Sequence, residues 1–84
     1  MAEPSLSELA LFLARAIVSN PDEVSVEEVE EDGATVVQVQ VDPQDVGRLI
    51  GRKGRTIDAL RTLVDVAASG SGRHGTVEVL EPER

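Results

Sequence analysis

Residues 49–57 of this chain read LIGRKGRTI, the most informative stretch in its 84 residues. Gly51 and Gly54 flank two basic residues, Arg52 and Lys53, and aliphatic residues lie on both sides of the tetrad. Glycine has no Cβ atom, so it allows a sharp turn and leaves room for another chain against the backbone. The stretch therefore predicts two helices joined by a tight, positively charged loop.

The residues around the loop predict these two helices. Asp42 lies where a helix N-cap belongs and Pro43 follows at the first helical position, which indicates a short helix over residues 43–50. Beyond the loop, apolar spacing predicts a helix from near Arg55 to the glycine-rich residues 70–72. Its buried stripe is predicted to hold Ile57, Leu60, Leu63, Val64 and Ala67.

The N-terminal part predicts one more helix. Ser5 and Glu8 have the spacing of a capping box, and the pattern ends at Asn20 and Pro21. The predicted apolar stripe holds Leu6, Leu9, Ala10, Leu13, Ala16 and Ile17. Leu11, Phe12 and Val18 lie outside it, and either widen the buried face or meet a partner.

Three strands complete the pattern. Alternating valines on both sides of Asp32-Gly33 predict a β-hairpin, with a bulge near the turn because Val29 and Val36 break the alternation. Residues 76–80 predict a last strand. The predicted order is α-β-β-α-α-β, an α+β fold.

Composition limits the possible functions. A chain this short builds one domain, and its 40% hydrophobic residues suffice for a core without a cofactor. Without cysteine or a long apolar run, we expect a cytoplasmic protein with no disulfide and no membrane span. The net charge is −8, yet residues 47–61 carry +4 and the remainder −12. The basic charge is concentrated around the loop.

The sequence gives no support for a catalytic site. The loop lacks the Gly-Lys-Ser/Thr ending of a P-loop, and His74 has no Ser, Cys or metal-ligand partner at meaningful spacing. The only aromatic residue, Phe12, cannot provide a stacking platform for bases. We expect neither an enzyme nor a metal or cofactor site.

The stretch 49–57 resembles the signature of KH domains, in which Gly-x-x-Gly clamps four nucleotides of single-stranded nucleic acid. From Leu6 to Leu80 the chain resembles small bacterial KH proteins of the KhpA type. The resemblance implies a single type II KH domain over residues 5–81, with short flexible termini at 1–4 and 82–84. It also implies a three-stranded sheet with helices packed on one face.

The resemblance further implies binding of single-stranded RNA, as a small RNA chaperone or post-transcriptional regulator. The RNA-binding residues it implies are Gly47, Arg48, Ile50, Gly51, Arg52, Lys53, Gly54, Arg55 and Ile57. Val77 and Val79 are expected to line an aliphatic groove for the bases, with Arg73 and His74 at its rim. Arg48 and Arg61 are equally compatible with ordinary surface positions.

The alternative is an interaction module in which RNA contact is secondary. KhpA-type proteins are linked to self-association, to a KhpB (Jag)-type KH partner and to cell shape and cell-wall regulation. The candidate interface positions are Leu11, Phe12, Val18, Ala59, Thr62 and Val66. Neither hypothesis involves a membrane or a small-molecule substrate.

Overall fold

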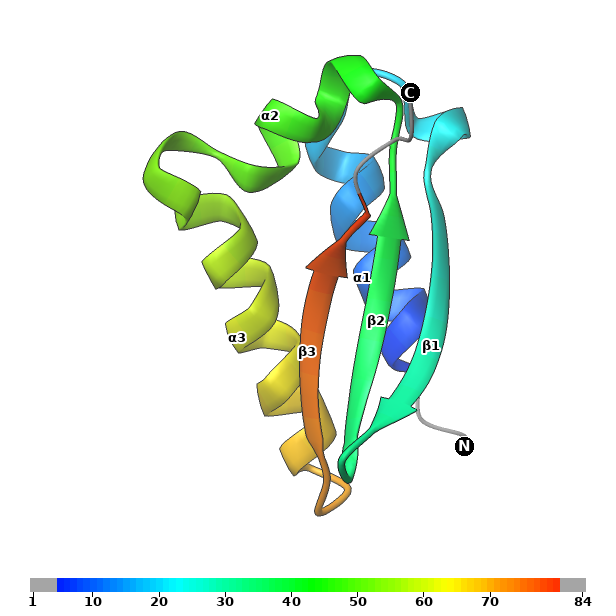
Figure 1. The fold of residues 1–84 in the computed structure, drawn as a ribbon, viewed down its shortest axis with the longest axis vertical. Helices are drawn as coiled ribbons and strands as arrows, with labels where there is room; N and C mark the ends of the chain where they lie inside the picture. Colours follow the sequence, from blue (N-terminus) through cyan, green and yellow to red (C-terminus); the bar gives the residue numbers. More distant parts are fainter. Residues whose placement is uncertain (1–4, 81–84) are drawn as a thin grey trace.

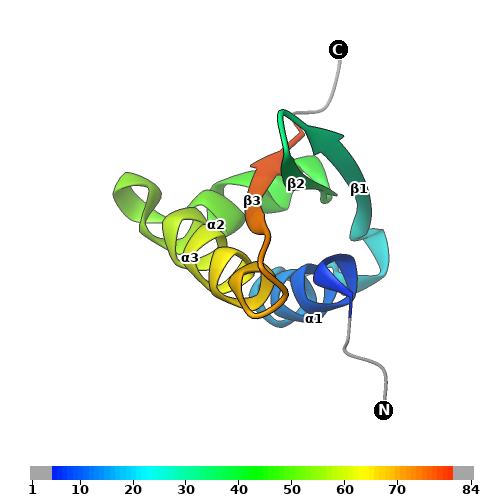
Figure 2. The same ribbon diagram turned by 90° about the horizontal axis from the view of Figure 1, so that it is seen from below.

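A mixed three-stranded sheet forms one layer and three α-helices form the other in the computed structural model, which describes residues 5–80 (Figures 1 and 2). The elements are α1 (Leu6–Ile17), β1 (Ser25–Glu31), β2 (Ala34–Gln40), α2 (Val46–Ile50), α3 (Arg55–Ser69) and β3 (His74–Val79). This order confirms the predicted α+β fold. The predicted termini, 1–4 and 82–84, lie outside the described residues, as does residue 81.

The β1–β2 hairpin is regular, so the predicted bulge is wrong. Pairing runs unbroken from Ser25 opposite Gln40 to Glu31 opposite Ala34. The turn needs only two residues, because Asp32 and Gly33 both adopt positive φ, 49° and 81°. Val29 and Val36 lie opposite each other, which explains their break in the alternation without an extra residue.

Strand β3 pairs with β2 in parallel, giving the sheet order β1-β2-β3. Parallel neighbours need a long crossover, which α2, the glycine loop and α3 supply. The strand begins at His74, two residues before the predicted start. This connection places the loop at one end of α3 and the start of β3 at the other (Figure 1).

The core lies between the two layers, and its helical residues differ in part from the predicted stripes. On α1, Leu6, Ala10 and Ala14 are buried. On α3, the buried residues are Ile57, Leu60, Val64 and Ala68. The predicted core positions Ala16, Leu63 and Ala67 are exposed, whereas the off-stripe Val18 is buried. The buried face of each helix therefore differs from its predicted stripe. On α3 the close approach is at Gly75, where a Cβ atom would lie 3.1 Å from Ala68 and from Val64.

Candidate nucleic-acid interface

The Gly51–Gly54 segment forms a tight hydrogen-bonded turn between α2 and α3. Residues Arg52–Gly54 make one 3₁₀ turn, closed by the Gly54 amide, which donates to the Gly51 carbonyl at 3.1 Å. Gly51, Lys53 and Gly54 all have positive φ, at 79°, 58° and 76°. A lysine in this region is uncommon, and the Lys53 side chain is exposed. The loop is therefore a defined structure before any ligand binds.

The two glycines serve different purposes. A Cβ atom on Gly51 would lie 2.3 Å from Thr56 Oγ1 and 2.9 Å from the Thr56 amide nitrogen, so this glycine is required by the fold itself. On Gly54 the nearest atom to such a Cβ is 4.0 Å away, on Ile57. The space expected beside Gly51 for a ligand is thus filled by the chain. Only the side of Gly54 stays open to an approaching strand.

Three cations surround this turn, and none has a neutralising partner among the described residues. Arg52, Lys53 and Arg55 are exposed, and none forms an ion pair within residues 5–80. Arg48, one turn before the loop, has a side chain that is 64% exposed, and its Nε lies 3.7 Å from Asp45 Oδ1. The positive charge predicted from the sequence is therefore gathered on one exposed corner.

The first turn of α3 adds a second source of positive potential. Its N-cap is Gly54, and no side chain of residues 5–80 caps this end, whereas the Ser5 side chain accepts from the Glu8 amide at the start of α1. Uncapped amide N–H groups and the helix dipole favour an anion at such an end. The amides and the loop cations therefore favour a phosphate at the same place.

Some of the residues flanking the loop are buried beneath it, and others are accessible at the surface. Leu49 is fully buried and Ile57 is 5% exposed, so both join the core beneath the loop. Ile50 is half-buried and Gly47 is exposed. Surface that a base could contact beside the loop is therefore provided by Ile50 and by the bare backbone at Gly47.

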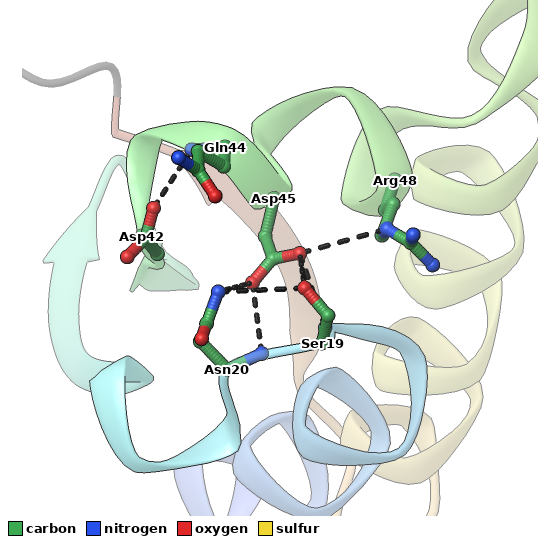
Figure 3. Close-up of polar contacts among 6 residues, drawn as sticks. All are labelled: Ser19, Asn20, Asp42, Gln44, Asp45 and Arg48. Atoms are coloured by element: carbon green, nitrogen blue, oxygen red, sulfur yellow. Dashed lines mark hydrogen bonds and ion pairs between the residues drawn. The ribbon is translucent and has the colours of Figure 1, made fainter.

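Asp45 is a functional candidate that the sequence analysis missed. It lies in the first turn of the helix predicted over residues 43–50, and its side chain is completely buried. It accepts hydrogen bonds from Ser19 and Asn20 in the turn after α1 (Figure 3). The Ser19 hydroxyl is the main reason that the pKa of Asp45 is lowered to about 2, against the opposing effect of burial. Spacing alone cannot distinguish a buried aspartate from an exposed one.

Other basic residues lie elsewhere. Arg61 donates from Nε to the Val77 carbonyl at 3.0 Å and from NH1 to Asp58 at 3.2 Å, so it covers the free edge of β3. Arg73 precedes His74 at the end of α3 opposite the loop, so both lie far from the Gly51–Gly54 turn. The separation follows from the length of α3, which is 15 residues, about 22 Å.

Membrane and metal chemistry gain no support from the described residues. No helix within residues 5–80 is both long and apolar enough to cross a bilayer. In the same part of the chain, no three His, Cys, Asp or Glu residues gather in a group that could hold a metal ion.

The mixed sheet, its helical layer and the Gly-x-x-Gly turn between two helices together define a KH domain. The family model described as "KhpA/KhpB, KH domain" matches residues 7–79. The chain belongs to this family, whose members are not enzymes.

Several proteins named RNA-binding protein KhpA are similar to the chain over most of its length. The protein from Mycobacterium bovis is 44% identical over 86% of both chains. The protein from Leifsonia xyli is 41% identical over 96% of this chain and 99% of its own. A third, from Caldanaerobacter subterraneus, is 37% identical over 89% of this chain and all of its own.

Proposed function

We propose that this chain binds single-stranded RNA by gripping the phosphate backbone at the Gly51–Gly54 turn. The observation that carries the proposal is the convergence of three cations, unpaired within residues 5–80, with the uncapped start of α3 on one exposed turn. Phosphates are the ligands favoured by such a site, and the open side of Gly54 lets the sugar-phosphate backbone approach. The names of the similar proteins support the same ligand.

Base contacts in this proposal are aliphatic and hydrogen-bonded. The only aromatic residue, Phe12, lies on α1 and is 71% exposed, away from the loop sequence. Bases instead contact Gly47 and Ile50, while Ile57 supports the loop from below. Such a site grips a strand without a stacking platform, which fits a small RNA chaperone or post-transcriptional regulator acting on many transcripts in the cytoplasm.

Charge reversal in the loop tests this proposal. The double variant Arg52→Asp, Lys53→Asp inverts the loop charge and leaves both glycines and the core unchanged. Its matched control, Arg15→Asp with Arg73→Asp, makes the same change in net charge at exposed positions outside the loop. Fluorescence anisotropy with a labelled single-stranded RNA pool should show binding lost in the loop variant and retained in the control. Equal losses in both would exclude a specific role for the loop.

A second candidate function is self-association, favoured by an exposed apolar stripe on α3. The stripe consists of Ala59, Leu63, Val66 and Ala67, with Val66 64% and Leu63 49% exposed. Leu63 lies midway between Ala59 and Ala67, four residues from each. An antiparallel copy of α3 would therefore place Leu63 against Leu63 and each alanine against its counterpart, as a twofold interface requires. The occupant we propose is a second copy of this chain.

Light scattering at increasing protein concentration tests this association. The wild type should reach the mass of a dimer, and Leu63→Glu should stay monomeric because it places a charge at the centre of the stripe. Ser25→Glu, at an exposed position on β1, is the control and should associate like the wild type. A wild type that is monomeric throughout would contradict self-association and leave the face to a KhpB-type KH partner.

A further inference from the structure

Helix α2 carries the loop but cannot hold itself in place. It has five residues, fewer than an isolated helix needs for stability in water. Two side chains of this segment are fully buried, those of Leu49 and Asp45. They are four residues apart, and so lie on the same side of the segment. With the partly buried Val46 and Ile50, which pack against the core, these two contacts hold α2 in position.

The two contacts differ in kind. Leu49 packs into the apolar core, an interaction without directional preference. Asp45 is held by four directional hydrogen bonds: Oδ1 accepts from the Ser19 amide at 3.1 Å and the Ser19 hydroxyl at 2.7 Å, and Oδ2 accepts from the Asn20 amide at 3.0 Å and Asn20 Nδ2 at 3.1 Å. Packing of Leu49 therefore holds α2 against the core, and the directional hydrogen bonds of Asp45 set the orientation of α2.

The carboxylate does not cap its own helix. Asp45 is the N-cap residue of α2 but makes no side-chain hydrogen bond to that helix. Instead it turns toward the segment after α1, which lies against α2 in Figure 3. Asp42 behaves differently, because it accepts from the nearby Gln44 amide at 2.9 Å. Asp45 therefore joins two segments that are 25 residues apart in sequence.

We infer that Asp45 is a positioning residue for RNA binding, whose buried carboxylate orients α2 and thereby the Gly51–Gly54 turn and Arg48. The turn follows directly after Ile50, and Arg48 Nε lies 3.7 Å from Asp45 Oδ1. A rotation of α2 changes where Arg48, Arg52 and Lys53 lie relative to the start of α3. This inference rests on the proposed function, because it names the group that holds the proposed RNA site in place.

The partners of Asp45 offer the sharpest variants. Asp45→Asn changes a fully buried group, so the variant could unfold. The decisive variant is therefore the double substitution Ser19→Ala, Asn20→Ala. It removes both side-chain donors and leaves the backbone donors in place. Ser19→Thr keeps the hydroxyl and should bind RNA like the wild type. Thr35→Val is the matched control, because it removes a buried hydroxyl that donates to Glu30 Oε1 at 2.8 Å, at the start of β2.

The measurement is the affinity of each folded full-length variant for a labelled random single-stranded RNA of about ten nucleotides. This length exceeds the four nucleotides that a KH loop clamps. We expect the Ser19, Asn20 double variant to bind about tenfold more weakly, the equivalent of one lost charge-assisted hydrogen bond. The amide NMR signals of Gly54 and Arg55 should shift in that variant. In Thr35→Val, both affinity and signals should match the wild type.

Two outcomes would overturn the inference. One is wild-type RNA affinity in the folded double variant, and the other is an equal loss in Thr35→Val, which would show a general effect of stability. In either case the charge-reversed loop variant would still lose RNA, so the proposed function would stand. If the wild type itself did not bind RNA, the proposed function would fail, and the positioning role with it.

Discussion

Gly47 lies inside α2, although no contact within residues 5–80 requires a glycine there. Apart from its chain neighbours and the backbone of its own helix, a Cβ atom at this position would meet no described atom within 4 Å. Glycine in a helix is about 0.5–1 kcal/mol less stable than alanine, so its presence costs stability without a packing reason. We therefore predict that Gly47→Ala raises the free energy of unfolding by about that amount and weakens RNA binding. Urea unfolding and anisotropy would measure the two effects, and unchanged affinity would show that RNA does not approach this backbone.

Asp45 makes the stability of the domain sensitive to acid. Its pKa is about 2 in the folded chain, against an ordinary value of 3.8, chiefly because the Ser19 hydroxyl donates to the carboxylate. The folded state thus binds this proton more weakly than the unfolded state. The stability that Asp45 contributes is complete above about pH 4 and is lost as the pH falls toward about 2.

Urea midpoints measured across this pH range check the prediction for Asp45. Ser19→Ala should raise the pKa of Asp45 toward its ordinary value, so the variant should lose less stability than the wild type on acidification. An identical acid loss in the two proteins would show that other carboxyl groups are responsible.

The tight turn and the charge of the loop were predictable from the sequence because both are local properties. A Gly-x-x-Gly tetrad with two basic residues specifies both its turn and its charge within four positions. Two features depended on contacts that spacing does not reveal and were not predictable. Thr56, five residues along the chain, fills the space beside Gly51, and Ser19, 26 residues away, donates to the buried carboxylate of Asp45. Burial by another part of the chain leaves no mark on local spacing.

At the scale of elements, the order and type of the helices and strands were predictable, and their orientation was not. Periodicity identifies a helix but locates its buried face only to within a neighbouring position. Leu63 and Ala67 therefore entered the predicted core, although Ala68 is the residue that faces the sheet. The predicted bulge was wrong because Val29 and Val36 form a cross-strand pair, which in the sequence resembles a break in the alternation of apolar residues.

Helix α3 carries two kinds of arginine, and this difference can be measured. Arg55 is exposed at the start of the helix, whereas Arg61 is engaged by the Val77 carbonyl and by Asp58. We predict that Arg55→Ala weakens RNA binding and makes its salt dependence shallower by about one phosphate contact. Arg61→Ala should lower the free energy of unfolding by about 1 kcal/mol and leave the salt dependence unchanged. A shallower salt dependence of RNA binding in Arg61→Ala would place Arg61 in the RNA site.

At the scale of the whole molecule, the negative net charge and the proposed ligand are compatible because opposite charges are segregated. The molecule measures 35 × 26 × 23 Å, and screening reduces interactions beyond about 8 Å at physiological salt. Exposed glutamates of β1, such as Glu27 and Glu31, lie at the sheet edge opposite β3. The loop extends from the helical layer, away from β1 (Figure 1). The acidic surface therefore repels nucleic acid that approaches elsewhere and leaves the loop available.

This segregation predicts weak, salt-sensitive and strand-selective binding. Three or four phosphates neutralised around the loop give a slope of about −2 to −3 for log K against log salt concentration, because each phosphate of a single strand contributes about −0.7. A duplex of the same sequence should bind more weakly, since its rigid, densely charged backbone brings more phosphates toward the acidic surface. Titrations of single-stranded and duplex RNA at several salt concentrations measure both effects. A much steeper slope, or equal affinity for the duplex, would require a larger basic surface than this loop provides.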